Sequence, residues 1–431
     1  MSRFQGGHTM WELLRAMLAP ALSSDREGNG SAWPFTIFWE LFGSGQSEQD
    51  MKPNFKNAVN KSIKLSVPGR LCLFGEHSDW AADYGIHRGF CIVIGTDQSI
   101  SAVAEPSDRF VVETQLPDSL GRPSGRTRQM RCPWTADHLL AAAKDQTEFF
   151  RHCAGVAFEI LNRLEVPGGV RIRITRMDLP LKKGVSSSAA VCILVAKAFN
   201  AIYGLRMFPH EIMELAYNGE RLTGSQCGRM DQACIYGKTP VLLTFEKSHG
   251  VRIEPIFCCH DIPMFFVDLA GSKDTVRILR DLGSSYSESK DLQRALGEEN
   301  ERIVRSAYEA ISTGEAAALG NLMVRAQENF DSLVSPHSPE QLRSPLLHKV
   351  LNLSPIRKHV YGGKGVGSQG DGTAQFVARS IADRDMAMAT IEAEFPQMRC
   401  FPLTISKNTS SNGTPLVSTA LPTPEVCPES S

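Results

Sequence analysis

The pattern of apolar and polar residues changes character near residue 63. From there apolar residues alternate with polar ones over 63–67, and the same face is apolar over 170–174, while 92–94 is a short apolar run. Successive side chains of a strand point to opposite faces, so these segments predict strands with at least one buried face. A sheet is therefore expected to begin at residue 63.

A long helix is expected to begin after Ser187. Apolar residues keep helical spacing from Val191 to Ile202, and Gly204 stands where a C-terminal cap belongs. Strand patterns follow at 241–243 and 264–267, and helical patterns lie around 291–312 and 315–333. Strands and helices mix without strict βαβ alternation, which predicts an α+β fold.

The two ends of the chain differ from its middle. Residues 1 to about 60 alternate between apolar clusters and Gly, Ser, Asp and Glu stretches, which predicts an extension that packs on the main body or on a partner. The stretch from about 408 to 431 is rich in Ser, Thr and Pro and offers too little apolar surface to offset its ordering entropy. We expect a disordered tail there.

Composition narrows the classes of function. The chain has 431 residues, 42% of them hydrophobic, and a net charge of −1 from 46 basic and 47 acidic side chains. Such a balance favours neither a nucleic-acid nor a membrane partner, and no stretch has the length and apolarity of a membrane helix or a secretory signal. The eleven cysteines form no C-x-x-C pair and are expected to be reduced core thiols. We expect a cytoplasmic protein.

The segment 179–190 carries the first candidate chemistry. It follows an alternating strand, brings together Lys182, Lys183, Gly184 and three serines, and opens the long helix. A glycine turn before a helix N-terminus presents unpaired N–H groups and positive potential, which is typical of a phosphate site. An ordinary serine-capped helix is the alternative. The common P-loop sequence is absent, and the G-x-G-x-x-G match at 365–370 follows no clear strand, so a dinucleotide fingerprint is not expected.

Two further segments concentrate carboxylates. A strand pattern ends at Gly75 and is followed at once by Glu76, His77 and Asp79, which can converge on a polyhydroxylated ligand such as a sugar; a solvated turn is the alternative. The glycine-rich segment 219–232 has Glu220 at one end and Asp231 at the other. One carboxylate there can serve a cation and the other a proton.

Together these segments resemble the GHMP kinases, the superfamily of galactokinase, homoserine kinase, mevalonate kinase and phosphomevalonate kinase. Residues 68–79 are similar to its first motif, 184–190 to its second and 362–372 to its glycine-rich third, in the family's order. The resemblance implies a two-domain α+β fold. A domain like ribosomal protein S5 domain 2 that binds ATP would span 61–250, and a C-terminal domain would span 251–406, leaving a 1–60 extension and a 407–431 tail.

The resemblance also implies roles for single residues. Asp231 would be the base that faces the acceptor hydroxyl, Arg70 would steady it and the transferring phosphoryl group, and Ser188 and Glu220 would hold Mg²⁺. The residues implied in ATP binding are Lys182, Lys183, Gly184, Val185, Ser186, Ser187, Ser188 and Ala189.

The Glu-His-x-Asp form of the first motif resembles galactokinase and related sugar 1-kinases, which implies that Glu76, His77 and Asp79 bind sugar hydroxyls. Trp80 stands where galactokinases usually carry Tyr, and Cys72 where they carry Asn, so the identity of the sugar stays open. The expected function is an ATP- and Mg²⁺-dependent kinase that makes a sugar 1-phosphate. The alternatives are a mevalonate-type alcohol kinase and a catalytically silent sensor of sugar and ATP.

Overall fold

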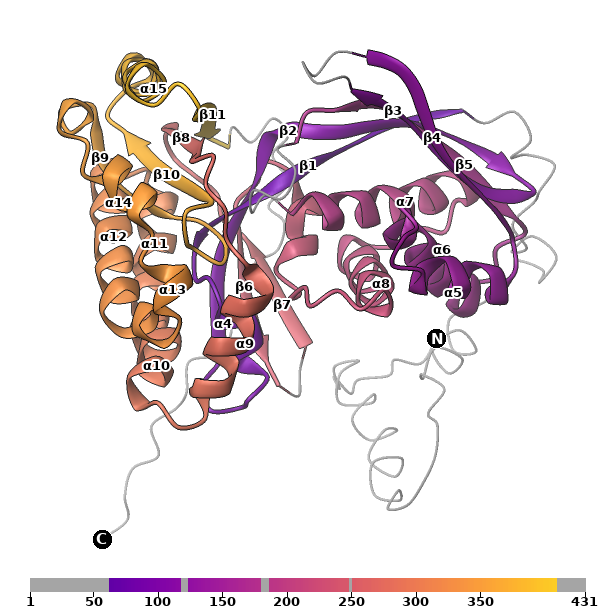
Figure 1. Ribbon diagram of the computed structural model, residues 1–431, viewed down its shortest axis with the longest axis horizontal. Helices are drawn as coiled ribbons and strands as arrows, with labels where there is room; N and C mark the ends of the chain where they lie inside the picture. Colours follow the sequence, from indigo (N-terminus) through magenta and orange to yellow (C-terminus); the bar gives the residue numbers. More distant parts are fainter. Residues whose placement is uncertain (1–61, 118–122, 180–185, 248–249, 409–431) are drawn as a thin grey trace, which may run out of the picture. The chain divides into compact units, whose positions relative to one another are not determined.

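The computed structural model describes residues 62–408, except for 118–122, 180–185 and 248–249 (Figure 1). The expected extension at 1–60 and nearly all of the expected tail at 407–431 lie outside the described residues.

The larger sheet has seven strands in the order β4-β3-β5-β2-β6-β7, with β1 paired to β2. β2 is long enough to pair with β1 along one edge and with both β5 and β6 along the other. β3 and β5 are parallel and the other neighbours are antiparallel. The strands are β1 (Ile63–Phe74), β2 (Gly89–Ser107), β3 (Arg109–Pro117), β4 (Pro123–Pro133), β5 (Gly169–Met177), β6 (Val241–Glu246) and β7 (Gly250–Pro255).

One face of this sheet is covered by helices α5 to α8 (Figure 1). The expected long helix is confirmed as α7, which ends at Gly204 in the left-handed conformation with φ 64°. Its apolar residues are buried against β1, β2 and β5, so its position is fixed by the core. The helices are α5 (Ala136–Lys144), α6 (Arg151–Arg163), α7 (Ser187–Tyr203) and α8 (Pro209–Leu222).

Helices α6 and α8 approach each other through glycine backbones. A Cβ atom added to Gly155 would lie 2.1 Å from the carbonyl oxygen of Gly219, and one added to Gly219 would lie 2.5 Å from the backbone of Val156. Neither position has room for a side chain without moving one helix away from the other. Because Glu220 follows Gly219 directly, this contact also sets where the last turn of α8 lies.

The smaller sheet has the order β11-β8-β10-β9, and all its neighbours are antiparallel. Its core lies against α14 and α15, and the helical segments expected near 291–312 and 315–333 are confirmed as α11 and α12, each joined to a π-helical turn. The strands are β8 (Ile262–Asp268), β9 (Val360–Gly365), β10 (Thr373–Ala378) and β11 (Arg399–Ile405). The helices are α9 (Thr275–Tyr286), α10 (Lys290–Arg294), α11 (Asn300–Thr313), α12 (Ala316–Asn329), α13 (Pro339–Leu342), α14 (Pro345–Leu351) and α15 (Ile381–Glu394).

The α+β class is confirmed, and one detail of the sequence analysis is wrong. A strand, β9, does precede the G-x-G-x-x-G match at 365–370. Its sequence is so rich in glycine that it lacks the apolar alternation by which strands are recognised. The next element is the antiparallel strand β10 and not a helix, so the match still lacks the strand–turn–helix context of a dinucleotide site.

The cysteines and the helices bear on two other expectations. The ten cysteines within the described ranges are all free, and most are buried, although Cys259 is exposed. None of the helices in these ranges combines the length and the apolarity needed to cross a membrane.

Candidate functional site

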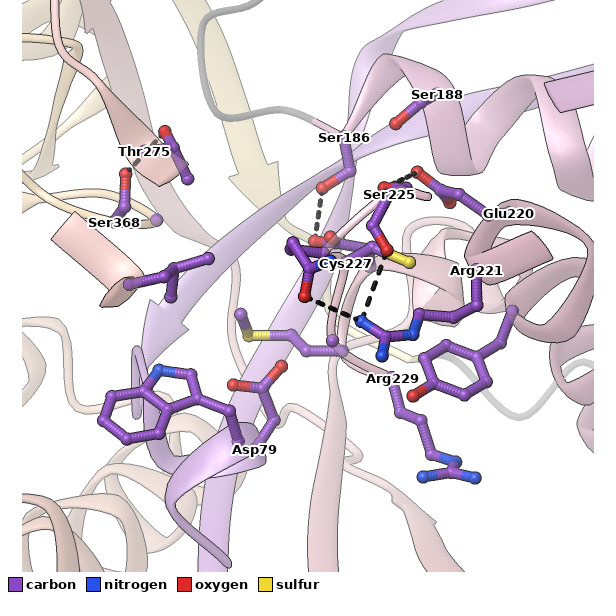
Figure 2. Close-up of a pocket in the computed structure, with 18 of the residues that line it drawn as sticks. Asp79, Ser186, Ser188, Glu220, Arg221, Ser225, Cys227, Arg229, Thr275 and Ser368 are labelled. Atoms are coloured by element: carbon purple, nitrogen blue, oxygen red, sulfur yellow. Dashed lines mark hydrogen bonds between the residues drawn. The ribbon is translucent and has the colours of Figure 1, made fainter. Parts of the chain in front are cut away.

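A cavity of about 1490 Å³ collects most of the predicted site residues (Figure 2). Its walls come from the end of β1, the short helix α4 (Ser78–Ala82), the first turns of α6, α7 and α9, the last turn of α8 and the loop before residue 231. Arg70, Ser188, Glu220 and Asp231 are among the lining residues. Segments far apart in the sequence therefore meet at one space.

Arg70 and Asp231 form an ion pair at this cavity. A register irregularity in β1 between Pro68 and Arg70 changes the direction of the strand at the point where the arginine leaves it. Asp231 begins the 3-10 helix η2 (Asp231–Tyr236), which is anchored by the buried side chains of Ala233 and Cys234. The Arg70 side chain is buried, and its Nε and Nη1 atoms find no hydrogen-bond partner among the described residues.

Ser186 joins this pair and does not cap α7. Its backbone is left-handed, with φ 54° and ψ 51°, and its hydroxyl donates to Oδ1 of Asp231 at 2.7 Å. The first N–H groups of α7 thus receive no cap from Ser186, and the following serines line the cavity. Of the residues predicted to bind ATP, Lys182, Lys183, Gly184 and Val185 lie outside the described residues. Ser187 and Ser188 line the cavity, whereas Ala189 is buried in the core.

Glu220 lies almost fully buried in the last turn of α8, with 1% of its surface exposed. Gln232 donates to its Oε2 at 2.9 Å and Ser225 donates to its Oε1 at 3.4 Å, and the side chain of Ser188 is also close enough to lower its pKa. Burial raises the pKa of Glu220, and these hydrogen bonds oppose the rise. A buried carboxylate near the negative end of a helix gains from a cation.

The donor atoms at this point suit a hard cation. The carboxylate of Glu220 and the hydroxyl of Ser188 are oxygen ligands, the type that Mg²⁺ prefers. Among the described residues no group of three or more His, Cys, Asp or Glu side chains is placed to hold a metal. A cation here would take its other ligands from water or from a phosphate-bearing ligand.

His77 and Asp79 line the opposite wall of the same cavity, at the start of α4. His77 has a left-handed backbone with φ 69°, and its Nδ1 accepts a hydrogen bond from the indole N–H of Trp80 at 3.0 Å. Its Nε2 is buried without a partner among the described residues. Burial lowers the pKa of His77 to about 4, and the positive charge of Lys273 contributes. Burial raises the pKa of Asp79.

Glu76 is placed differently from its neighbours in the motif. Its carboxylate forms a buried ion pair with Lys364 of β9, and Glu76 is not one of the residues that line the cavity. The structure thus brings His77 and Asp79 to the site and leaves Glu76 behind it. A direct contact between Glu76 and a ligand stays a prediction.

Three residues at the site were not singled out for it by sequence reasoning. Lys364 and Trp80 hold Glu76 and His77, and Lys273 donates to the carbonyl oxygen of Gln369 at 2.7 Å and so holds the glycine-rich turn after β9. A lysine between glycines was the only signal for Lys364. No sequence pattern predicts that the indole N–H of Trp80 donates a hydrogen bond at the site.

One end of the cavity is apolar. Phe149, Phe150, Ile174, Met177 and Val191 line it. Beside them, the ring nitrogen Nδ1 of His152 lies 3.1 Å from the hydroxyl of Thr223, which itself donates to the carbonyl oxygen of Glu220. Burial lowers the pKa of His152 to about 4. This end can hold a flat apolar group beside the start of α7.

Comparison with known sequences finds similarity to GHMP kinases and to galactokinases. The profile of the "GHMP kinases N terminal domain" matches residues 149–238. A galactokinase from Thermotoga petrophila is 22% identical over 306 residues, which cover 63% of this chain and 78% of that protein. A galactokinase from Pyrococcus furiosus is 27% identical over 250 residues, which cover 56% of this chain and 62% of that protein.

Solved structures share the fold. The Lactococcus lactis galactokinase complexed with galactose has a TM-score of 0.60 at 15% identity, and the match covers 86% of this chain and 97% of that one. The Methanococcus jannaschii mevalonate kinase has a TM-score of 0.60 at 17% identity, with 81% of this chain and 99% of that one covered.

Proposed function

Because this chain belongs to the GHMP kinase superfamily and is galactokinase-like in sequence, we propose that it transfers a phosphoryl group from ATP to the anomeric hydroxyl of a sugar. The chain is a phosphotransferase, and its substrate is a small sugar or alcohol. The sugar, the anomeric position, ATP and Mg²⁺ are our proposal.

The observation that carries the proposal is the pairing of Arg70 with Asp231 at a cavity that also holds Glu220. Phosphoryl transfer needs mainly positioning and neutralisation of charge. Arg70 forms an ion pair with Asp231 and has two further guanidinium nitrogens for phosphoryl oxygens. Transfer of a phosphoryl group to a hydroxyl requires a carboxylate near the hydroxyl and N–H donors that can bind the phosphoryl oxygens.

In this proposal Asp231 accepts the proton of the acceptor hydroxyl. The hydroxyl oxygen bonds to the γ-phosphorus, and the bond between that phosphorus and the bridging oxygen of ADP breaks. The N-terminus of α7 with Ser187 and Ser188 faces the phosphates. Glu220 and Ser188 would hold Mg²⁺, which would supply neutralisation of phosphate charge. The apolar end near Phe150 takes the base.

On the acceptor side we propose that His77 and Asp79 contact sugar hydroxyls. The ring N–H of His77 can donate to one sugar hydroxyl, and the carboxylate of Asp79 can accept from another. Asp79 favours a sugar over a mevalonate-type alcohol, because the Glu-His-x-Asp form of the motif resembles galactokinase and related sugar 1-kinases. Glu76, which pairs with Lys364, is also proposed to contact a sugar hydroxyl. We also propose the domain division at 250/251, which the two separate sheets support.

Release of ADP, measured over a panel of sugars and mevalonate, tests the proposal. We expect turnover with a sugar only, dependent on ATP and Mg²⁺, and a product whose phosphorus couples to the anomeric proton in the NMR spectrum. Turnover with mevalonate alone would replace the sugar by the alcohol. Binding of ATP and sugar without turnover would indicate a sensor.

A further inference from the structure

Trp80 makes a side-chain hydrogen bond to His77 at the start of α4. Its indole N–H donates to Nδ1 of His77 at 3.0 Å, and neither side chain caps α4. The two rings meet edge to face with centroids 5.9 Å apart. The other side of the imidazole stacks on Phe330 at 5.9 Å. His77 is therefore held from two directions.

Trp80 is itself held in place. Its ring packs edge to face on Tyr286, with centroids 5.6 Å apart, and on Tyr84 at 6.2 Å. Tyr286 is completely buried in α9, and the hydroxyl of Tyr84 donates to the carbonyl oxygen of Gly283 in the same helix. The direction of the indole N–H is thus set by packing against α9.

This bond decides where the proton of His77 lies. An indole N–H is only a donor, so Nδ1 must be the acceptor and a neutral ring carries its proton on Nε2. Nε2 is buried and makes no hydrogen bond of normal geometry among the described residues, although the backbone of Ser368 acts on the ring and raises its pKa, and His77 lines the cavity. Leaving a buried N–H unpaired is costly, so a ligand oxygen at this wall gains from meeting it.

We infer that Trp80 is a positioning residue that fixes His77 as its Nε2–H tautomer, so that this wall selects a substrate with an acceptor oxygen at that point. The inference rests on the proposed function for the identity of the substrate, but the tautomer stands on the contacts alone. A hydroxyl satisfies His77 by accepting, and its own proton remains for Asp79. An ammonium group, which only donates, would leave Nε2–H unpaired.

The variant Trp80→Phe tests this inference, because it keeps an aromatic ring and removes the N–H. In ¹⁵N-labelled protein, long-range proton–nitrogen correlations report which ring nitrogen carries the proton, and loss of the signals in His77→Asn assigns them. We expect a single Nε2–H tautomer in the unchanged protein and a mixture of tautomers in Trp80→Phe. The matched control is Tyr286→Phe, which removes a hydroxyl from the same aromatic cluster, and we expect its His77 signals to be unchanged.

Kinetics provide the second arm, with D-galactose or the sugar identified by the panel. We expect the KM for sugar to rise about 3- to 10-fold in Trp80→Phe, the effect of one weakened hydrogen bond, with kcat and the KM for ATP within twofold. A merely structural role would move both KM values and kcat together.

The two arms separate this inference from the proposed function. An Nδ1–H or doubly protonated His77 at pH 7 in the unchanged protein would overturn the inference even if Trp80→Phe fails to fold. Unaltered His77 signals and sugar kinetics in a folded Trp80→Phe protein would also overturn it. A fixed tautomer in a protein that phosphorylates no sugar would count against the proposed function and support the positioning by Trp80.

Discussion

Glu76 and Lys364 form a buried ion pair that joins the turn after β1 to strand β9 of the smaller sheet. The two residues are 288 positions apart in the sequence, and each has less than a tenth of its surface exposed. Lys364 also donates to the carbonyl oxygen of Gly365 at 2.8 Å. A carboxylate next to the proposed sugar contacts is thus neutralised from within the protein.

Replacing Lys364 by Met should destabilise the protein strongly. The change leaves the carboxylate of Glu76 buried without its partner, and such a loss costs about 3 to 5 kcal/mol. We expect a clearly lower urea midpoint. The double variant Glu76→Gln/Lys364→Met should recover much of this stability, because no uncompensated charge remains. A Lys364→Met protein as stable as the unchanged one would show that the pair contributes nothing.

The proposed base is tested by Asp231→Asn. The amide keeps the shape but cannot accept the proton, so kcat should fall by about 10² to 10⁴-fold. ATP binding, measured by calorimetry, should persist. Asp108→Asn, in the exposed bend between β2 and β3, is the matched control and should retain activity. Near-normal kcat in Asp231→Asn would make this residue a structural aspartate.

Glu220→Gln should separate activity from stability. Because burial raises the pKa of Glu220, the charged carboxylate is disfavoured in the folded protein without a cation. The neutral amide should therefore leave the thermal midpoint in Mg²⁺-free buffer unchanged or higher. We expect the Mg²⁺ concentration needed for half-maximal ADP release to rise at least tenfold. Equal Mg²⁺ dependence in both proteins would remove Glu220 from the cation site.

His77 should make the protein less stable in acid. Its folded pKa is lowered to about 4, while the unfolded chain takes up the proton near the ordinary value of 6.5. Between these values the unfolded state binds more protons, so stability is present above pH 6.5 and is lost as the pH falls toward 4. From pH 7 to pH 5 this loss is about 1 to 2 kcal/mol.

Urea unfolding at pH 7 and pH 5 measures this loss. The comparison is between the pH-induced change in the unchanged protein and that in His77→Gln, so that other titrating groups cancel. We expect a smaller loss in the variant. The same loss in both proteins would mean that His77 titrates normally in the folded state.

The sequence was most informative where chemistry and secondary structure depend on neighbours in the chain. The helix beginning after Ser187 was readable from its spacing, and the residues Arg70, Ser188, Glu220 and Asp231 were named before the structure showed that they share a cavity. These four residues were assigned to one site because the segments that contain them resemble the family's motifs. Spacing alone would not have joined Arg70 to Asp231 across the fold.

The sequence was least informative about what lies behind the cavity wall. From the sequence, Glu76, His77 and Asp79 are predicted together as ligand-binding residues. The tertiary fold separates Glu76 from the other two, because it pairs Glu76 with Lys364. In the same way, the serine segment that includes Ser186 reads as a phosphate site or, alternatively, as an ordinary capped helix start. The left-handed backbone of Ser186 instead directs its hydroxyl to Asp231. In both cases the side chain bonds to a partner that is distant in the sequence, and local sequence patterns do not reveal such partners.

The glycine contact between α6 and α8 has a consequence for how this protein tolerates change. A methyl group at residue 155 or 219 would push the last turn of α8 outward and carry Glu220 with it. Two positions that touch no ligand would then govern cation affinity. A library randomised at these two helix positions should yield folded proteins graded by their Mg²⁺ requirement, even though every residue of the cavity is unaltered.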